Sequence, residues 1–262
     1  MHENEATAQG FRLVYELMDL DERGGELLSD LLDEAERRGF AGLNITYPCK
    51  QAVIPLLHEL SEEADAVGAV NTVQFSAGRR IGYNTDAWGF EESFRRGLRG
   101  ASLTHVVQIG AGGAGAATAF ALLRLGARRL SIVDTDFGRA RTLAGTLAQH
   151  FANPDVSAAR DLDLAQVLAD AAGIVNSTPV GMEKHPGSAV PPDLLRADLW
   201  VTDIVYFPIE TQLLRRARAA GCRTLDGGGM AVYQAARAFE IFTGRTADSA
   251  RMRQRFETTT VT

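Results

Sequence analysis

Six consecutive small residues, Gly110-Ala111-Gly112-Gly113-Ala114-Gly115, stand directly after an apolar run that ends at Ile109. The run over 103–109 is typical of a buried strand, and a small-residue helical pattern follows over 116–125. Glycines at this spacing allow a tight turn, close approach of the backbone to a pyrophosphate, and close helix–strand packing. Free amides at the helix N-terminus would bind the phosphates. The pattern predicts a dinucleotide site; the alternative is a Gly- and Ala-rich helix start selected for packing alone.

Asp134 ends the next strand-like run, 130–133, and bears on the choice of cofactor. A carboxylate there accepts hydrogen bonds from both adenosine ribose hydroxyls and repels a ribose 2′-phosphate. The alternative is a solvated acid at a strand end. A second acid, Asp136, follows, and the first arginine is Arg139. We therefore include Asp134 and Arg139 in the cofactor site and predict a preference for NAD over NADP.

A polar turn that contains proline follows a predicted strand over 173–176 and lies where a nicotinamide would project. A further strand over 199–206 and the glycine turn over 226–229 follow later in the chain. The residues assigned to this part of the cofactor site are Thr178, Pro179, Val205, Gly228 and Met230.

Hydride transfer requires a group that moves the hydroxyl proton, and Lys50 with Asp86 is the best pair in the sequence. An amine beside a carboxylate is held in position, and partial burial lowers the pKa of a lysine so that it can shuttle a proton. Taken alone, Lys50 is more often a solvated lysine at a helix start. Thr46, Asn71 and Asp86 favour the catalytic interpretation.

Three further polar residues are candidates for substrate binding. Asn44 lies near the end of a buried strand, where ligands gather in open α/β sheets. Gln234, on a late helix, is either a buried amide satisfied by the backbone or a donor to a substrate hydroxyl. Tyr206 either caps a core at a strand end or contacts the ligand.

The elements that must position these residues follow from periodicity and turn signals. The chain opens in a helix over 1–10, a strand is expected over 11–18, and Gly24 and Gly25 break the chain. The remaining predicted elements are strands over 40–47, 67–75, 80–83 and 222–225 and helices over 26–38, 51–57, 88–98, 139–149, 162–168, 210–220 and 230–242.

Composition limits the classes of protein to which the chain can belong. The chain has 262 residues, 45% of them hydrophobic and 23% charged, which suits a soluble globular protein of one large or two modest domains. A net charge of −6 argues against nucleic-acid binding, and no apolar run is long enough to span a bilayer. Cys49 and Cys222 form no metal-ligand or redox spacing, and the five histidines form no pairing typical of a metal site. We expect a cytoplasmic protein without a catalytic metal or a membrane partner; a homodimer is compatible with the sequence.

The chain resembles the shikimate and quinate dehydrogenase family through six ordered motifs that together cover nearly all of it. The motifs are Asn44-x-Thr46-x-Pro48-x-Lys50, Asn71-Thr72, Asn84-Thr85-Asp86, Asn176-Ser-Thr178-Pro179-Val-Gly181-Met182, Asp203-Ile-Val-Tyr206-Phe-Pro208, and Gly229-Met230 to Gln234-Ala235.

The resemblance implies an α/β protein of two domains. A Rossmann-type doubly wound parallel sheet, over 88–228, would be inserted into an α/β substrate domain built from 1–87 and 229–262. It also implies reversible oxidation of the ring secondary alcohol of shikimate, to 3-dehydroshikimate, or of quinate, to 3-dehydroquinate. Lys50 and Asp86 would be the catalytic pair, and Thr46, Asn71 and Gln234 would hold ring hydroxyls.

Two departures from the family pattern matter. Asp134-Thr135-Asp136 stands where NADP-using members carry an Asn-Arg-Thr type segment. In this respect the chain resembles the NAD-dependent branch, which accepts quinate and shikimate. The family also begins with a strand and a Ser-x-Ser/Thr-Pro segment that binds the substrate carboxylate, whereas this sequence starts at Met1-His2. We expect the native start to lie upstream.

Two other functions remain open at this point. One is a non-catalytic dinucleotide-binding paralogue, and the other is a dehydrogenase of a different cyclic polyol or of an aminated analogue.

Overall fold

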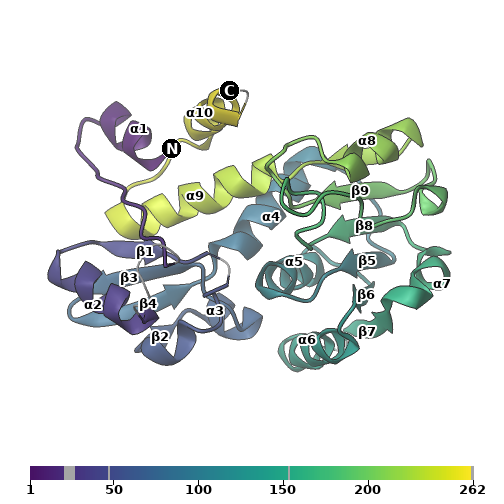
Figure 1. The fold of residues 1–262 in the computed structure, drawn as a ribbon, viewed down its shortest axis with the longest axis horizontal. Coiled ribbons are helices and arrows are strands. Elements are labelled where there is room, and N and C mark those ends of the chain that lie inside the picture. Colours follow the sequence, from purple (N-terminus) through teal and green to yellow (C-terminus); the bar gives the residue numbers. More distant parts are fainter. Residues whose placement is uncertain (21–26, 47, 153, 261–262) are drawn as a thin grey trace. The chain divides into compact units, whose positions relative to one another are not determined.

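The computed structural model describes residues 1–20, 27–46, 48–152 and 154–260. It divides into two compact units, Met1–Thr85 with Val232–Thr262, and Asp86–Ala231 (Figure 1). The first unit is therefore built from both ends of the chain, and the second is one continuous segment.

A four-stranded sheet forms the centre of the first unit, in the order β1 (Gly42–Asn44), β3 (Thr72–Ser76), β4 (Arg79–Tyr83), β2 (Glu59–Leu60). β3 pairs antiparallel with β1 and β4, and β2 runs parallel to β4. The β3–β4 hairpin turns through Ala77 and Gly78, with φ of 49° and 72°. Positive φ at both central residues matches the right-handed twist of paired strands.

Helices from the two chain ends complete this unit. They are α1 (His2–Ala8), α2 (Leu28–Arg37), α3 (Glu62–Val67), the part of α9 (Gly228–Thr243) from Val232 onward, α10 (Ser249–Thr260), and the 3-10 helix η1 (Ile54–Leu56). α1 lies beside α10 (Figure 1). Their contact includes Glu5, whose carboxylate is 1% exposed and accepts hydrogen bonds from Nε and Nη2 of Arg251 at 2.7 and 2.8 Å.

Two predicted elements of this unit are wrong. The segment 11–18 contains no strand. A strand requires a neighbour that bonds its backbone, and here the Tyr15 amide donates to the Glu3 carboxylate at 3.0 Å while Leu17 is 89% exposed. The helix expected over 51–57 is a turn followed by the short η1. The chain break predicted at Gly24 and Gly25 lies outside the described residues.

The second unit is a six-stranded, all-parallel sheet. The strand order is β10 (Arg223–Leu225), β9 (Trp200–Asp203), β8 (Gly173–Asn176), β5 (Val106–Ile109), β6 (Arg129–Asp134), β7 (Asp155–Arg160). The order reverses direction between β5 and β8. In doubly wound sheets ligands bind beyond the carboxyl ends of the strands at such a reversal.

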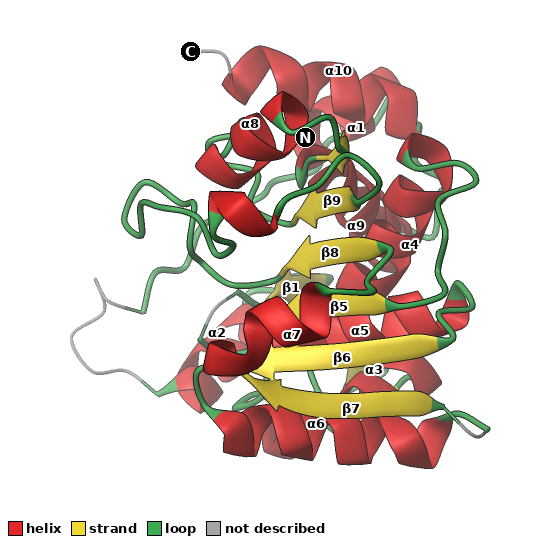
Figure 2. Ribbon diagram, turned by 90° about the vertical axis from the view of Figure 1, so that its right-hand side faces the viewer, coloured by secondary structure: helices red, strands yellow, loops and turns green. Residues whose placement is uncertain are grey.

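Helices cover both faces of this sheet. Figure 2 looks onto the sheet, with α7 (Leu164–Leu168) in front and α5 (Gly113–Arg124) and α6 (Phe137–His150) behind. Leu213 and Leu214 of α8 (Gln212–Ala219) pack in the same core cluster as α7, with Val107 and Ile109 of β5. The remaining elements are α4 (Thr85–Gly97) and the 3-10 helices η2 (Asp161–Asp163) and η3 (Pro192–Leu194). The fold is thus α/β, with a Rossmann-type sheet inserted into a unit made from both chain ends.

Five elements of the described chain were absent from the sequence expectations: β2, α3, β7, η3 and α10. Among the described strands β7 pairs with β6 alone, and it has no run of apolar residues, because an edge strand buries little of its surface. Among the described residues, no helix combines the length and the apolar character that crossing a membrane requires.

Candidate active site

The glycine-rich turn lies at the carboxyl end of β5, where the strand order reverses. Gly110 has a φ of +104°, and a Cβ there would lie 2.9 Å from the carbonyl carbon and oxygen of Ser177. A Cβ on Gly115 would lie 2.3 Å from the Gly110 oxygen. Larger residues would therefore displace the turn from the loop after β8 or from the start of α5.

Gly112 differs from these two glycines because a Cβ on it would meet nothing within 4 Å. It is also the N-cap of α5, and no side chain caps that helix end. Uncapped amides at a helix N-terminus favour an anion, and the open space beside Gly112 leaves room for one. The residues present therefore fit the pyrophosphate of a dinucleotide, as the sequence predicts.

Asp134 reaches the glycine-rich turn directly. It is the last residue of β6, and its Oδ2 accepts a hydrogen bond from the Ala111 amide at 2.8 Å. Its Oδ1 accepts another from the Asp136 amide at 2.8 Å. The structure thus brings the predicted ribose-binding acid to the predicted phosphate-binding turn.

Arg139 is paired within the first turn of α6. Its Nε lies 3.2 Å from Oδ2 of Asp136, which caps the helix by accepting from the Arg139 amide. The hydrogen bond from the Arg139 side chain holds the pKa of Asp136 below its usual value. The first arginine after Asp134 in the sequence is therefore paired with its own neighbour.

The loop after β8 is fixed by buried polar groups. The Asn176 side chain donates to the Val180 carbonyl and to Asp203 Oδ1, both at 3.0 Å, and its Oδ1 accepts from the Thr178 hydroxyl at 2.7 Å. Asp203 also accepts from the Thr211 hydroxyl at 2.7 Å. Burial raises the pKa of Asp203 to about 6, against the lowering effect of these donors.

Thr178 and Pro179 consequently belong to a loop whose shape is set by Asn176 and Asp203. The site prediction omitted both of these residues. A signal existed, because each is a polar residue at the end of a buried strand, where an unsatisfied group would be costly.

The glycine turn before α9 approaches the end of β9. A Cβ on Gly227 would lie 2.3 Å from the Ile204 carbonyl oxygen and 2.7 Å from that of Val205. The Gly228 amide donates to Asp226 Oδ1 at 2.9 Å, and Val205 and Met230 are buried. The structure therefore places Val205 next to the turn that carries Gly228.

A second polar group lies in the first unit, around Asn71. The Asn71 side chain donates to the Thr85 hydroxyl at 3.0 Å and accepts from the Thr85 amide at 2.8 Å. The Thr85 hydroxyl lies 3.4 Å from Gln234 Oε1, and the Asn44 side chain donates to Thr72 Oγ1 at 3.1 Å. These contacts unite three of the predicted substrate residues, Asn44, Asn71 and Gln234. Thr85, which joins two of them, was missed.

The predicted catalytic pair comes from two different segments. Lys50 is half-buried in the turn after β1, and its carbonyl accepts a hydrogen bond from the Val70 amide at 2.8 Å, beside Asn71. Asp86 follows Thr85 in the first turn of α4 and is 6% exposed. Thr46 is exposed just beyond β1, and Tyr206 is 50% exposed just beyond β9.

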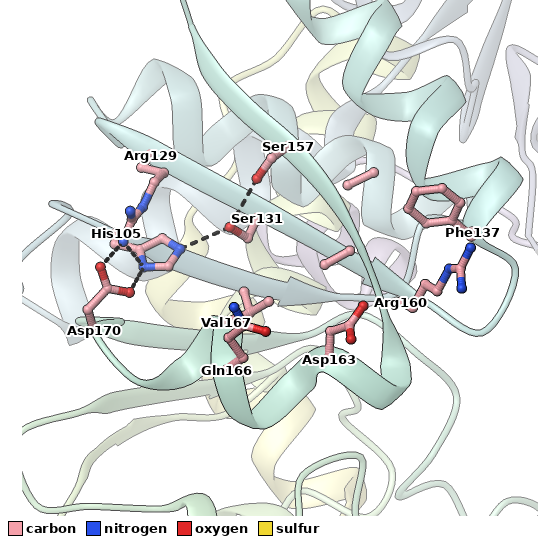
Figure 3. A pocket seen from close by; sticks show the side chains of 12 residues that line it. His105, Arg129, Ser131, Phe137, Ser157, Arg160, Asp163, Gln166, Val167 and Asp170 are labelled. Carbon is pink, nitrogen blue, oxygen red and sulfur yellow. Dashed lines mark hydrogen bonds and ion pairs between the residues drawn. The ribbon is translucent and has the colours of Figure 1, made fainter.

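A cavity of about 480 Å³ lies elsewhere, on the α7 side of the parallel sheet (Figure 3). None of the predicted site residues lines it. His105 Nε2 lies 2.9 Å from Ser131 Oγ, His105 Nδ1 lies 2.9 Å from Asp170, and Arg129 pairs with Asp170. The polar side chains at this end of the cavity are thus occupied with one another.

Comparison with known proteins decides the family. A model described as the shikimate dehydrogenase substrate binding domain matches residues 1–73, and one described as the shikimate 5'-dehydrogenase C-terminal domain matches 227–255. The chain is 54% identical over 254 residues to shikimate dehydrogenase (NADP(+)) of Streptomyces avermitilis, covering 96% of this chain and 87% of that protein. The chain belongs to the shikimate dehydrogenase family. Membership makes it an oxidoreductase that uses a nicotinamide dinucleotide.

Other members of the shikimate dehydrogenase family differ in the cofactor that their names give. Quinate/shikimate dehydrogenase (NAD(+)) of Corynebacterium efficiens is 48% identical over 259 residues, covering 98% of this chain and 91% of that protein. The solved quinate dehydrogenase from Corynebacterium glutamicum in complex with NAD has a TM-score of 0.93 and 47% identity, covering 98% of this chain and 92% of that one. The relatives thus include both NAD- and NADP-named enzymes.

Proposed function

We propose that this chain catalyses the reversible, NAD-dependent oxidation of the ring secondary alcohol of shikimate, quinate or both. The observation that carries the proposal is the glycine-rich turn closed by the Asp134 carboxylate. Family membership supports the substrate class, since close relatives are named for shikimate and quinate. Bound NAD would supply the hydride acceptor.

One unit would bind the dinucleotide and the other would bind the ring substrate. Residues 88–228 would hold the dinucleotide, with the pyrophosphate at Gly112 and the start of α5 and the adenosine ribose at Asp134. Residues 1–87 and 229–262 would bind the ring. Asn71 and Gln234 would present their amides to ring hydroxyls, and the Thr85 hydroxyl keeps both amides in place.

Lys50 and Asp86 would move the proton. During oxidation, Lys50 would take the proton from the hydroxyl whose carbon loses hydride, and during reduction it would return that proton. The 6% exposed Asp86 would hold the lysine amine in orientation and favour its charged form after proton uptake.

The preference for NAD over NADP rests on charge. Asp134 would repel a ribose 2′-phosphate, and Arg139, which could compensate, is already paired with Asp136. An NADP-using site needs a free cation at this position. Asp134, through its charge, and Asp136, by pairing with Arg139, therefore both disfavour NADP.

The test is NADH or NADPH formation, followed by absorbance, from shikimate and from quinate with NAD and NADP offered in turn. We expect turnover with NAD and at least one of the two acids, and a lower kcat/KM with NADP. Cofactor binding without turnover of either acid would favour the non-catalytic paralogue or another cyclic alcohol. Equal kcat/KM with both cofactors would refute the role of Asp134.

A further inference from the structure

Gln108 is an unusual residue for its position. It lies within β5, one of the two central strands of the six-stranded parallel sheet, and is completely buried. Parallel strands covered on both faces carry mostly apolar residues, because a buried polar group without partners is costly. The amide therefore needs a compensating set of hydrogen bonds.

Those bonds lead to the glycine-rich turn and to helix α5, which follows it. Gln108 Nε2 donates to the carbonyl oxygens of Gly110 at 3.0 Å and Gly115 at 2.8 Å, the first and last glycines of the motif. Its Oε1 accepts from the Thr118 hydroxyl at 2.8 Å. Because both carbonyls are acceptors, the Gln108 side chain must direct its NH₂ group toward them, and this fixes the orientation of its amide.

The network continues to the loop after β8. The hydroxyls of Thr118 and Ser177 lie 2.9 Å apart, and both residues are buried. The Thr118 hydroxyl, which also lies 3.1 Å from the Gly115 carbonyl, gives its single proton to the nearer acceptor, Gln108 Oε1, so Ser177 must donate to Thr118. The hydrogen bonds then form one directed chain, from Ser177 through Thr118 and Gln108 to the turn.

One peptide plane links this chain to Asp134. In a trans peptide the C=O and N–H groups point in opposite directions. The Gly110 oxygen points to Gln108, so the amide of the same peptide, that of Ala111, points away and donates to Asp134 Oδ2 at 2.8 Å. A rotation of this plane would break both bonds at once.

We propose that Gln108 is a positioning residue for the cofactor, which acts by fixing the Gly110–Ala111 peptide and, through it, the Asp134 carboxylate. The inference rests on the proposed NAD-dependent function and adds a residue to it. Gln108 would not touch the cofactor. It would keep the turn and the ribose-binding acid in their binding geometry before the cofactor arrives, so that binding does not have to order them.

The test compares Gln108→Leu with a matched control, Ser131→Ala. Leucine has a similar volume but removes the Nε2 donor, so the Gly110 carbonyl loses its bond from Gln108, while the Gly115 carbonyl keeps only the Thr118 hydroxyl at 3.1 Å as a side-chain donor. The control removes the buried hydroxyl of Ser131, on the neighbouring strand β6. This hydroxyl bonds His105 and lies outside the glycine-rich turn. NADH dissociation constants would be measured by fluorescence titration, and KM and kcat with NAD, NADP and shikimate or quinate by absorbance, below the unfolding temperature of every variant.

For Gln108→Leu we expect the dissociation constant of NADH to rise about tenfold or more, which corresponds to about 1.4 kcal/mol. The kcat at saturating NAD and the KM for the ring substrate should stay within about threefold. The ratio of kcat/KM for NAD to that for NADP should fall about fivefold, because a misplaced Asp134 discriminates less. General destabilisation alone would not change this ratio. Ser131→Ala should leave binding and the ratio unchanged.

Unchanged NADH affinity and an unchanged cofactor ratio in Gln108→Leu would overturn the inference while leaving the proposed function intact. Failure of the unmodified chain to bind NADH would overturn both. Should Gln108→Leu not fold, Thr118→Val answers the same question, since it removes the donor to Gln108 Oε1; we expect a threefold or larger loss of NADH affinity. An unaltered affinity in that variant would refute the directed chain.

Discussion

Replacing Glu5 by glutamine tests the claim that both ends of the chain build one unit. The Glu5 carboxylate accepts two hydrogen bonds from Arg251, one from the Asp248 amide at 3.0 Å and one from the Gln9 side chain at 2.7 Å. The hydrogen bond from Arg251 is the main reason that the pKa of Glu5 is lowered from 4.5 to about 2. Glutamine keeps the shape but loses the charge and turns an amide N–H₂ toward these donors.

The size of the effect follows from the pKa difference. A pKa lower by about 2.5 units in the folded state is worth about 3.4 kcal/mol at neutral pH. The Arg251 side chain is 41% exposed, and solvent screens its charge, so we expect Glu5→Gln to lower the free energy of unfolding by about 2–3 kcal/mol. The folded state binds fewer protons than the unfolded state. The contribution is therefore complete above the unfolded pKa of about 4.5 and declines as the pH falls toward 2, by roughly 40% at pH 3.5.

The assay is urea unfolding at pH 7.5, 5.5 and 3.5, followed by circular dichroism, for the original chain and for the variant. Glu257→Gln is the matched control, because Glu257 pairs with Arg253 on the surface of the same helix α10 and such a pair stabilises little. A loss no larger in Glu5→Gln than in the control would refute the reasoning. A difference that is equal at all three pH values would also refute it.

Three further predictions concern the site and its loops. Lys50→Ala should lower kcat about 100-fold or more and leave the NADH dissociation constant nearly unchanged; turnover within a few-fold of the original would exclude a proton-transfer role. Asp134→Ala should raise KM for NAD and narrow the preference over NADP, measured as the ratio of kcat/KM values, and an unaltered ratio would contradict the charge argument. Asp203 has a folded pKa of about 6, above its usual 3.8, so its stabilising contribution is greatest at low pH and is lost as the pH rises through 6. The free energy of unfolding of the original chain minus that of Asp203→Asn should fall by about 2 kcal/mol between pH 4.5 and 7.5, and a constant difference would show that Asp203 stays ionised throughout.

Much of the second unit, Asp86–Ala231, could be predicted from local sequence. Each strand–turn–helix step there is short, and its chemistry lies in adjacent residues such as Gly110 to Gly115. Asp134 could be assigned because the geometry of a βαβ unit fixes where the next strand ends. The edge strand β7 escaped prediction because it lacks the apolar run that marks buried strands.

The first unit was less predictable because its contacts are distant in sequence. The segment 11–18 has the alternation of a strand, yet a strand forms only where its backbone pairs with that of a neighbouring strand. In the part of the chain that the structure describes, no strand pairs with this segment. Glu5 and Arg251 are separated by 246 positions, and no local sequence pattern predicts their ion pair. Thr85 was missed for the same reason, since its role comes from Asn71 and Gln234.

By itself the sequence determined the class of fold and the family, and it predicted the dinucleotide turn and the acid expected to bind the ribose, because each depends on residue types at short, fixed spacing. Only the tertiary structure decided which polar side chains are buried together. It showed that Gln108 donates to the carbonyls of Gly110 and Gly115, that Asp136 pairs with Arg139, and that Asp203 is completely buried. The physical reason is that burial and hydrogen-bond partnership are properties of the space around a group, which distant segments of the chain fill.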